Sequence, residues 1–245
     1  MNTYIILAAG KGANLQPLTL GYPKTSYRLD EETTVLQRMV RGIRRVDRDA
    51  EISVVVGYRA SAVRNELAGL NVKFVMNPFY EVTNSVASLW FARAYLEREN
   101  VAIVHGDVVF SDALIEGCLA VPTDYPYVLV DSSRTTGGGY CAVTQDDEVL
   151  VMSKRLDRPS SRYCCMTKLD PVSSRLLKQE VDEMVNAGMH GQYFEDALVQ
   201  MVMFHDFQLF FRDIAGESWA EVDAVDDLLA AQEIHRTSKF HEGFV

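Results

Sequence analysis

Apolar residues in the first half of the chain form short continuous runs that alternate with stripes at helical spacing. The run 3–8 is continuous and ends at a glycine-rich turn, as is typical of a buried parallel strand. Residues 36–46 carry apolar side chains at helical spacing, with arginines between them. The same reasoning predicts further strands at 52–56, 72–76 and 101–104 and helices at 60–68 and 84–97.

Strands separated by helices of this length indicate βαβ units. We therefore expect an α/β fold, Rossmann-like and doubly wound, whose mostly parallel mixed sheet carries helices on both faces. Such sheets bind ligands beyond the carboxyl ends of their strands. Three strand ends are thus candidate parts of a site: Ala8-Ala9-Gly10, Gly57-Tyr58 and Gly106-Asp107.

Beyond Pro122 the pattern changes to shorter strand candidates with polar turns between them. The predicted strands are 127–130, 140–144, 149–153, 163–167, 207–211 and 219–222, and the predicted helices are 173–186, 194–203 and 224–235. No internal repeat or linker separates the two parts, so we expect one domain over 1–245.

Composition and charge narrow the functional classes. The chain has 245 residues and a net charge of -10, which disfavours a nucleic-acid clamp because such a clamp needs a basic surface. The apolar run near the amino terminus is too short for a signal peptide or a membrane span, so we expect a cytoplasmic protein without a membrane partner. Cysteines 118, 141, 164 and 165 lack a CxxC spacing and are expected to be reduced thiols.

The turn after the first strand reads Leu-Ala-Ala-Gly-Lys-Gly over 7–12 and is followed by Pro-Leu-Thr at 17–19 and Pro-Lys at 23–24. Its glycines let the backbone approach a phosphate, and consecutive amides can bind an anion. A third fingerprint glycine and a Walker lysine are both missing. The residues alone therefore leave a phosphate-binding loop and an ordinary tight turn open.

The whole string resembles the signature of the nucleotidylyltransferases, which join a nucleoside triphosphate to a phosphorylated small molecule. Within them the chain resembles the small cytidylyltransferases for phosphocholine, 2-aminoethylphosphonate and related compounds. The stretches 55–58, 77–80, 83–84 and 219–223 carry this closer resemblance. It is strong over 1–110, thin from about 120 to 210, and returns at 217–232.

The resemblance implies a nucleotide-binding part at 1–120 and an acceptor-binding and closing part at 121–245. CTP and a small phosphorylated or phosphonate acceptor would be the partners, Mg²⁺ the cofactor, and a homodimer a candidate assembly. The implied nucleotide-binding residues are Leu7, Ala8, Ala9, Gly10, Gly12, Asn14, Gly57, Tyr58, Asn84 and Ser85. The implied catalytic residues are Lys24, Asp107 and Lys154, and the implied metal ligands are Asp107, Glu221 and Asp223.

We add Tyr80 and Glu195 as candidate contacts for an amine on the acceptor, the tyrosine through a cation–π contact. Several of these residues also have a purely structural interpretation. Asp107 could cap a helix that starts near Ser111, and Asp223 could cap the last helix. Lys154 could be a solvated lysine at a strand end.

One position departs from the family pattern. Asn14 stands where the family has an arginine that clamps the β- and γ-phosphates. Losing such a contact costs about 1.5–3 kcal/mol, or roughly 10- to 150-fold in rate, unless Lys11, Arg59 or Arg162 compensates. Two alternatives to a cytidylyltransferase therefore stay open: a transferase that uses another nucleotide and a sugar 1-phosphate, and a regulatory module that only binds nucleotide.

Overall fold

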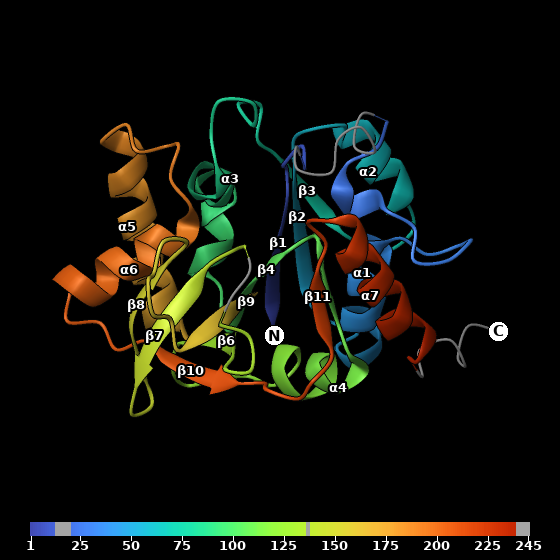
Figure 1. Ribbon diagram of the computed structural model, residues 1–245. Helices are drawn as coiled ribbons and strands as arrows, with labels where there is room; N and C mark the ends of the chain where they lie inside the picture. Colours follow the sequence, from blue (N-terminus) through green and yellow to red (C-terminus); the bar gives the residue numbers. More distant parts are fainter. Residues whose placement is uncertain (13–20, 136–137, 239–245) are drawn as a thin grey trace.

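The computed structural model describes residues 1–12, 21–135 and 138–238 (Figure 1). The strands are β1 (Thr3–Ala8), β2 (Glu51–Val56), β3 (Lys73–Met76), β4 (Val101–His105), β5 (Val108–Phe110), β6 (Tyr127–Asp131), β7 (Cys141–Gln145), β8 (Glu148–Ser153), β9 (Ser161–Leu169), β10 (Phe210–Asp213) and β11 (Trp219–Glu221). The helices are η3 (Lys24–Ser26), α1 (Val35–Val46), α2 (Ala60–Glu66), α3 (Ser85–Phe91), η4 (Arg93–Glu97), α4 (Asp112–Leu114), η5 (Ile115–Leu119), α5 (Pro171–Asn186), α6 (Phe194–Phe204) and α7 (Val225–Arg236).

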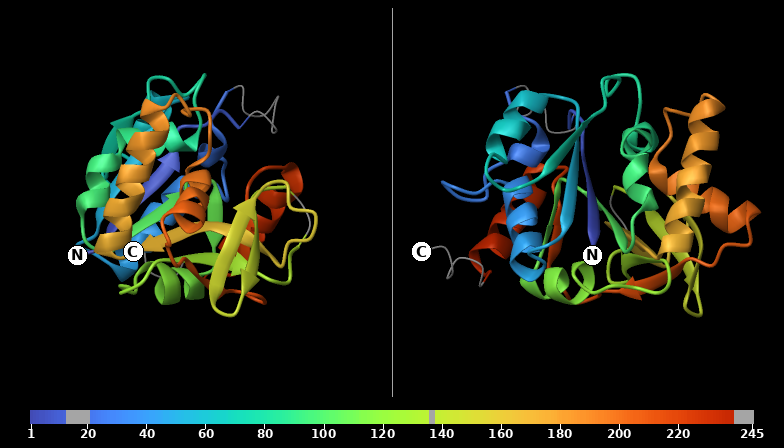
Figure 2. Two further views of the ribbon diagram at one scale, coloured as in Figure 1. Left: turned by 90° about the vertical axis from the view of Figure 1, so that its left-hand side faces the viewer. Right: turned by 180° about the vertical axis from the view of Figure 1, so that it is seen from behind.

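A nine-stranded sheet in the order β3-β2-β1-β4-β9-β6-β10-β8-β7 forms the centre of the structure. β3, β2, β1 and β4 run parallel and form what we call the parallel half. The remaining strands of this sheet form the antiparallel half, in which β6 and β10 are the one pair of described strands that runs parallel. The predicted α/β fold is confirmed, and its helices cover both faces of the sheet (Figure 2).

The large sheet has a hydrophobic core on each of its two faces, and the side chains of β1 point alternately into one and the other. Tyr4 and Ile6 of β1 pack with α1 and α2, whereas Ile5 packs with α3, α5 and α6 on the other face. A smaller cluster lies between α7, β5 and β11, to one side of the large sheet. Because β1 is buried on both faces, the residues that follow it are held between the two helical layers.

Three differences from the predicted elements concern the ends and partners of strands. β5 was missed, and β11 pairs with β5 in a separate two-stranded sheet rather than with the large sheet. β10 starts at Phe210, where it pairs with Tyr127, and so lies later than the predicted 207–211. None of the described helices is long and apolar enough to cross a membrane.

Candidate active site

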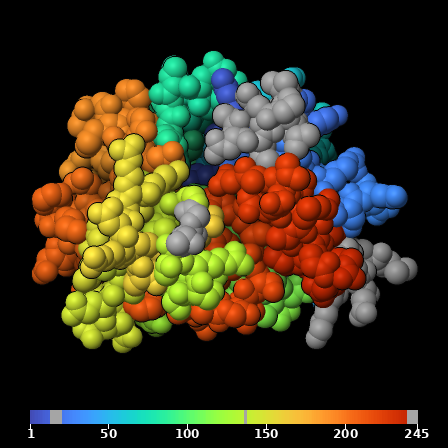
Figure 3. Space-filling model, in the orientation of Figure 1, coloured from blue at the N-terminus to red at the C-terminus, as the bar shows by residue number. Residues whose placement is uncertain are grey.

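A cavity of about 450 Å³ lies at the carboxyl ends of β1 and β4. Figure 3 shows a hollow near the centre of one face, where residues of the dark-blue amino terminus are visible beside the red carboxyl-terminal segments. Its lining combines the predicted turn with residues far along the chain: Leu7, Ala8, Ala9, Gly10, Lys11, Gly12, Lys24, Thr25, Tyr80, Thr83, Asn84, Ser85, Ser88, His105, Asp107, Gly139, Tyr140, Lys154, Tyr163, Cys165, Tyr193, Glu195, Glu221 and Asp223.

The glycine turn is tightly packed where it meets other parts of the site. Gly12 has a φ of +65°, and a Cβ there would lie 3.0 Å from the Cβ of Lys24. A Cβ on Gly57 would lie 2.8 Å from the carbonyl oxygen of Ala9, and the amide of Tyr58 donates to that oxygen at 3.0 Å. Gly57 and Tyr58 therefore pack against the turn and are not among the residues that line the cavity, and their predicted contact with nucleotide stays a prediction. Asn14 lies outside the described residues.

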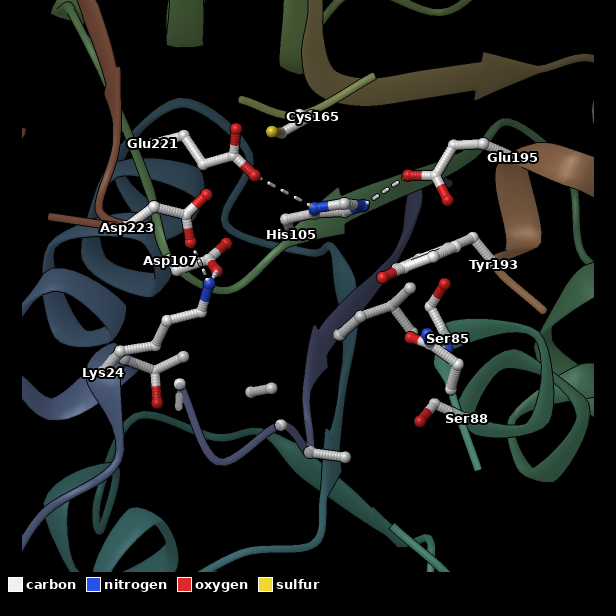
Figure 4. Close-up of a pocket in the computed structure, with 18 of the residues that line it drawn as sticks. Lys24, Ser85, Ser88, His105, Asp107, Cys165, Tyr193, Glu195, Glu221 and Asp223 are labelled. Atoms are coloured by element: carbon white, nitrogen blue, oxygen red, sulfur yellow. Dashed lines mark hydrogen bonds and ion pairs between the residues drawn. The ribbon is translucent and has the colours of Figure 1, made fainter. Parts of the chain in front are cut away.

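Three carboxylates from distant parts of the chain meet beside the turn. Asp107 follows β4, Glu221 ends β11, and Asp223 follows it. One oxygen from each of them lies within 4.8 Å of the others. Lys24 Nζ pairs with Asp107 and lies 2.7 Å from Asp223 Oδ1 (Figure 4). The structure thus brings together all three predicted metal ligands and the predicted catalytic lysine.

Neither Asp107 nor Asp223 has the helix-capping role that the sequence also allowed. The hydroxyl of Ser111, not Asp107, accepts the hydrogen bond at the start of α4. At the start of α7, the carboxylate of Asp227 accepts from the backbone amides of residues 223 and 224, while the side chain of Asp223 turns to Lys24. Both aspartates therefore direct their carboxylates into the cavity instead of capping a helix.

The electrostatics of this group favour a cation. Burial opposes charge on Lys24, but Asp107 and Asp223 outweigh it and raise the pKa of Lys24. Burial would raise the pKa of Asp107, yet Lys24 holds it below its usual range. Burial, Asp107 and Asp223 together raise the pKa of Glu221, whose Oε2 accepts from Arg162 at 2.9 Å. Among these acids, Glu221 is thus the one whose negative charge is poorly compensated.

The chemistry of the three carboxylates fits a divalent cation that prefers oxygen ligands. Among the described residues, the buried Oδ1 of Asp107 has no hydrogen-bond partner. Carboxylate oxygens are the ligands that Mg²⁺ takes in proteins, usually together with phosphate oxygens of a substrate. Asp107, Glu221 and Asp223 are therefore the residues that could hold Mg²⁺.

His105 is a residue of the cavity that the sequence did not single out. Its Nε2 lies 2.8 Å from Glu195 Oε1, and its Nδ1 lies 4.0 Å from Glu221 Oε1. Burial alone would lower the pKa of His105, but Glu195 raises it to about 9. Glu195 lines the cavity but is fully buried and already pairs with His105, and its predicted contact with an acceptor amine stays a prediction. The only available signal was the position of His105, two residues before Asp107 at the end of a strand.

Lys154 reaches the cavity over aromatic side chains. Its Nζ lies 3.9 Å from the centre of the Tyr193 ring and 5.5 Å from that of Tyr140. Tyr80 also lines the cavity, with Lys11 Nζ 5.8 Å from its ring centre. The predicted acceptor residues thus belong to a partly aromatic section of the lining.

The three cations considered as substitutes for an arginine at position 14 have different surroundings. Lys11 lines the cavity and pairs with Glu81 at 3.0 Å. Arg162 is paired with Glu221, and Arg59 is the residue immediately before α2. Of the three, Lys11 is the one that lies on the glycine turn itself.

The fold and the cavity together define a class of protein: an α/β protein whose glycine turn, lysine and carboxylates suit a phosphate-bearing ligand at the carboxyl ends of parallel strands. Residues 4–178 match the family described as the MobA-like NTP transferase domain, and the chain belongs to this family. It is therefore a member of a nucleotidyltransferase family of enzymes.

Two curated relatives carry cytidylyl chemistry in their names. The chain is 33% identical over 132 residues to the CMP-5'-(3-aminopropyl)phosphonate synthase of Streptomyces rubellomurinus, covering 48% of this chain and 19% of that protein. It is 26% identical over 135 residues to the CTP:phosphoglutamine cytidylyltransferase of Campylobacter jejuni, covering 53% of this chain and 52% of the relative. The chain thus spans about half or less of these relatives.

The CTP:phosphocholine cytidylyltransferase of Streptococcus pneumoniae has the same fold. The two structures superpose with a TM-score of 0.79 at 18% sequence identity, over 96% of this chain and 100% of the other. At this identity the likeness shows the fold alone. It confirms the predicted nucleotide-diphospho-sugar transferase-like architecture.

Proposed function

We propose that this protein transfers a cytidylyl group from CTP to a small amine-bearing phosphate or phosphonate, with Mg²⁺ as cofactor, and releases pyrophosphate. The observation that carries the proposal is the meeting of Lys24, Asp107 and Asp223 beside the glycine turn in one cavity. Compounds of the proposed acceptor class appear in the names of the Streptomyces and Streptococcus proteins. CTP appears in the names of the Campylobacter and Streptococcus proteins.

Repulsion between the substrates is the problem that this site must solve. Two like charges 4 Å apart repel by about 4 kcal/mol at an effective dielectric of 20, and both substrates carry several negative charges. When bound by the three carboxylates, Mg²⁺ supplies compensating charge and polarises the attacked phosphorus. Lys24 places a partly buried ammonium next to the same acids and can neutralise the acceptor or α-phosphate.

The reaction itself is an in-line displacement. An oxygen of the acceptor phosphate forms a bond to the α-phosphorus of CTP, and the bond from that phosphorus to the α,β-bridging oxygen breaks. The electron pair of the broken bond leaves with pyrophosphate. Since the acceptor oxygen is already ionised, this chain needs no general base. Its residues therefore act by holding the two phosphorus groups in line and by compensating their charge.

The two ends of the cavity support different parts of the proposal. We assign the turn over 7–12 to the triphosphate, with Lys11 as the cation that replaces an arginine at position 14. We assign Lys154 to the acceptor phosphate and the ring face of Tyr193 to an amine on the acceptor. Tyr80, whose ring lies beside Lys11 of the turn, stays a second candidate contact for that amine. Glu195 adds a negative charge behind this end, although it is paired with His105.

Pyrophosphate release tests the proposal directly. Purified protein with Mg²⁺ is given each of CTP, UTP, dTTP and ATP with phosphocholine, phosphoethanolamine, 2-aminoethylphosphonate or glucose 1-phosphate. We expect release with CTP and at least one amine-bearing acceptor. Release only with glucose 1-phosphate would instead indicate a sugar nucleotidyltransferase. Binding of CTP without release on any acceptor would indicate a regulatory module.

A further inference from the structure

A second group of metal-binding side chains lies next to the three carboxylates. His105 ends β4, Cys165 lies within β9, and Glu221 ends β11, so three separate strands contribute to it. One potential ligand atom from each lies within 4.8 Å of the others. Figure 4 shows the Cys165 sulfur beside the Glu221 carboxylate and close to the His105 ring. We propose that these three residues bind a thiophilic divalent cation such as Zn²⁺.

The orientation of His105 supports this assignment. Its Nε2 faces the fully buried Glu195 at 2.8 Å, and its ring makes edge contacts with Tyr163 and Phe194. A metal-bound histidine typically presents its other ring nitrogen to a carboxylate in this way. The fixed ring therefore directs Nδ1 toward Glu221.

The distance between Nδ1 and the Glu221 carboxylate suits a bridging ion. The two atoms are 4.0 Å apart, which is too long for a hydrogen bond. Zinc binds imidazole nitrogen and carboxylate oxygen at about 2.0–2.2 Å each, so an ion between these atoms reaches both after a small adjustment.

Cys165 gives the group its preference for a soft metal. It is buried, lines the cavity, and has a φ of +60°, an uncommon conformation for a residue with a side chain. Its neighbour Cys164 donates to the carbonyl of Arg162 at 3.4 Å, whereas within the described residues the Cys165 thiol has no hydrogen-bond partner. Thiolate and imidazole ligands favour Zn²⁺ or Co²⁺, and carboxylate sites favour Mg²⁺. Three protein ligands leave the fourth position of a tetrahedral ion open.

Binding of the divalent cation to these three residues releases protons and needs no other reactant. The cation forms bonds to sulfur, nitrogen and oxygen, and the protons of the Cys165 thiol and of His105 Nδ1 leave to solvent. The site becomes occupied without any oxidant or other reactant. Glu221 is shared with the group of three carboxylates, so one carboxylate faces both metals. Resting on the proposed function, Zn²⁺ should therefore slow magnesium-dependent pyrophosphate release by drawing Glu221 away from Asp107 and Asp223.

Cobalt spectroscopy tests the site without nucleotide or acceptor. We expect chelator-treated protein to develop a thiolate-to-cobalt charge-transfer band on titration with Co²⁺, and Zn²⁺ but not excess Mg²⁺ to remove it. C165S should lose the band, while C164S, the matched neighbouring cysteine, should keep it. A wild-type protein without the band, or a C165S protein that retains it, overturns the proposal.

A second variant keeps the test independent of how well C165S folds. E195Q leaves all three ligands in place and should keep the band while weakening Co²⁺ binding about 10- to 100-fold, as loss of an outer partner does. Unchanged affinity would contradict the role of Glu195. For the regulatory effect, the ratio of pyrophosphate release with and without Zn²⁺ should move toward one in C165S. The cobalt band does not depend on nucleotidyl transfer, so failure of either proposal leaves the other standing.

Discussion

The parallel and antiparallel halves of the sheet contribute to the same cavity in different ways. The parallel half supplies backbone, in the turn after β1, and one carboxylate directly after β4. The antiparallel half and its helices supply side chains that reach in from several elements, among them Lys154, Cys165 and Glu195. Glu221 and Asp223 come from neither half, because β11 pairs with β5 outside the large sheet. The acid group therefore depends on parts of the chain that are over 100 residues apart.

The two halves also differ in how they compensate buried or partly buried charged side chains. On the parallel half, Asp107 and Lys24 compensate each other at the edge of the cavity. On the antiparallel half, Lys168 of β9 is fully buried and donates to the carbonyl of Leu119, a backbone partner without charge. The first arrangement suits chemistry on anions, whereas the second affects the free energy of unfolding and how it changes with pH. Four substitutions distinguish charged residues that act in the reaction from a charged residue that affects stability.

The largest expected effect is that of D107N. Removing a ligand of a charge-compensating metal costs several kcal/mol, so pyrophosphate release should fall by about 10³-fold. The matched control is D147N on the exposed turn between β7 and β8, which removes the same charge far from the acid group. Magnesium-dependent turnover that persists in D107N while D147N is normal would exclude Asp107 as a ligand.

K24M should have the next largest effect. The ammonium of Lys24 makes charge-assisted contacts with two acids, and losing contacts of this kind costs about 1.5–3 kcal/mol. We expect kcat/KM to fall roughly 10- to 150-fold. K73M at the exposed edge strand β3 is the control. Equal kcat/KM values for the two variants would contradict a role for Lys24 in the reaction.

K154A should distinguish binding of the acceptor from binding of the nucleotide. If Lys154 meets the acceptor, the KM for the acceptor rises about tenfold and the KM for CTP changes little. R155A changes the neighbouring exposed cation and should leave both constants near their wild-type values. Equal increases in both KM values for K154A would show that Lys154 does not distinguish the acceptor from the nucleotide.

K168M should affect stability rather than activity. Burial lowers the pKa of Lys168 from 10.5 to about 8. Between these values the unfolded chain binds more protons at this residue than the folded chain, so its contribution to the free energy of unfolding rises with pH over this window and is lost as pH falls through 8. Urea unfolding across this pH range should show a smaller rise for K168M than for wild type. Identical pH dependence of the two proteins would contradict the shifted pKa.

The sequence predicted the parallel half well because its signals are local. A continuous apolar run ending at Gly10 defines β1 and the turn, and Asp107 follows a second such run. The antiparallel half depends on pairing between distant strands. Nothing local indicated that the strand at Trp219 would pair with Phe110 rather than enter the large sheet.

The site shows the same division between local and distant information. Gly57 and Tyr58 follow a strand as the site residues do, yet they pack behind the turn, because Tyr80 fills the space beside Gly57. His105 carried no motif of its own, and only the folded chain places it between Glu195 and Glu221. Side-chain pairing across elements is a property of tertiary packing, which a pattern along one strand does not contain.

Binding of Mn²⁺ in the presence of a non-hydrolysable CTP analogue, followed by electron paramagnetic resonance, tests most directly whether carboxylates from two distant parts of the chain form one cation site. We predict that D107N and D223N each weaken Mn²⁺ binding by about tenfold or more, since each removes a charged oxygen ligand. Wild-type Mn²⁺ affinity in D223N, with D107N alone impaired, would contradict a shared site.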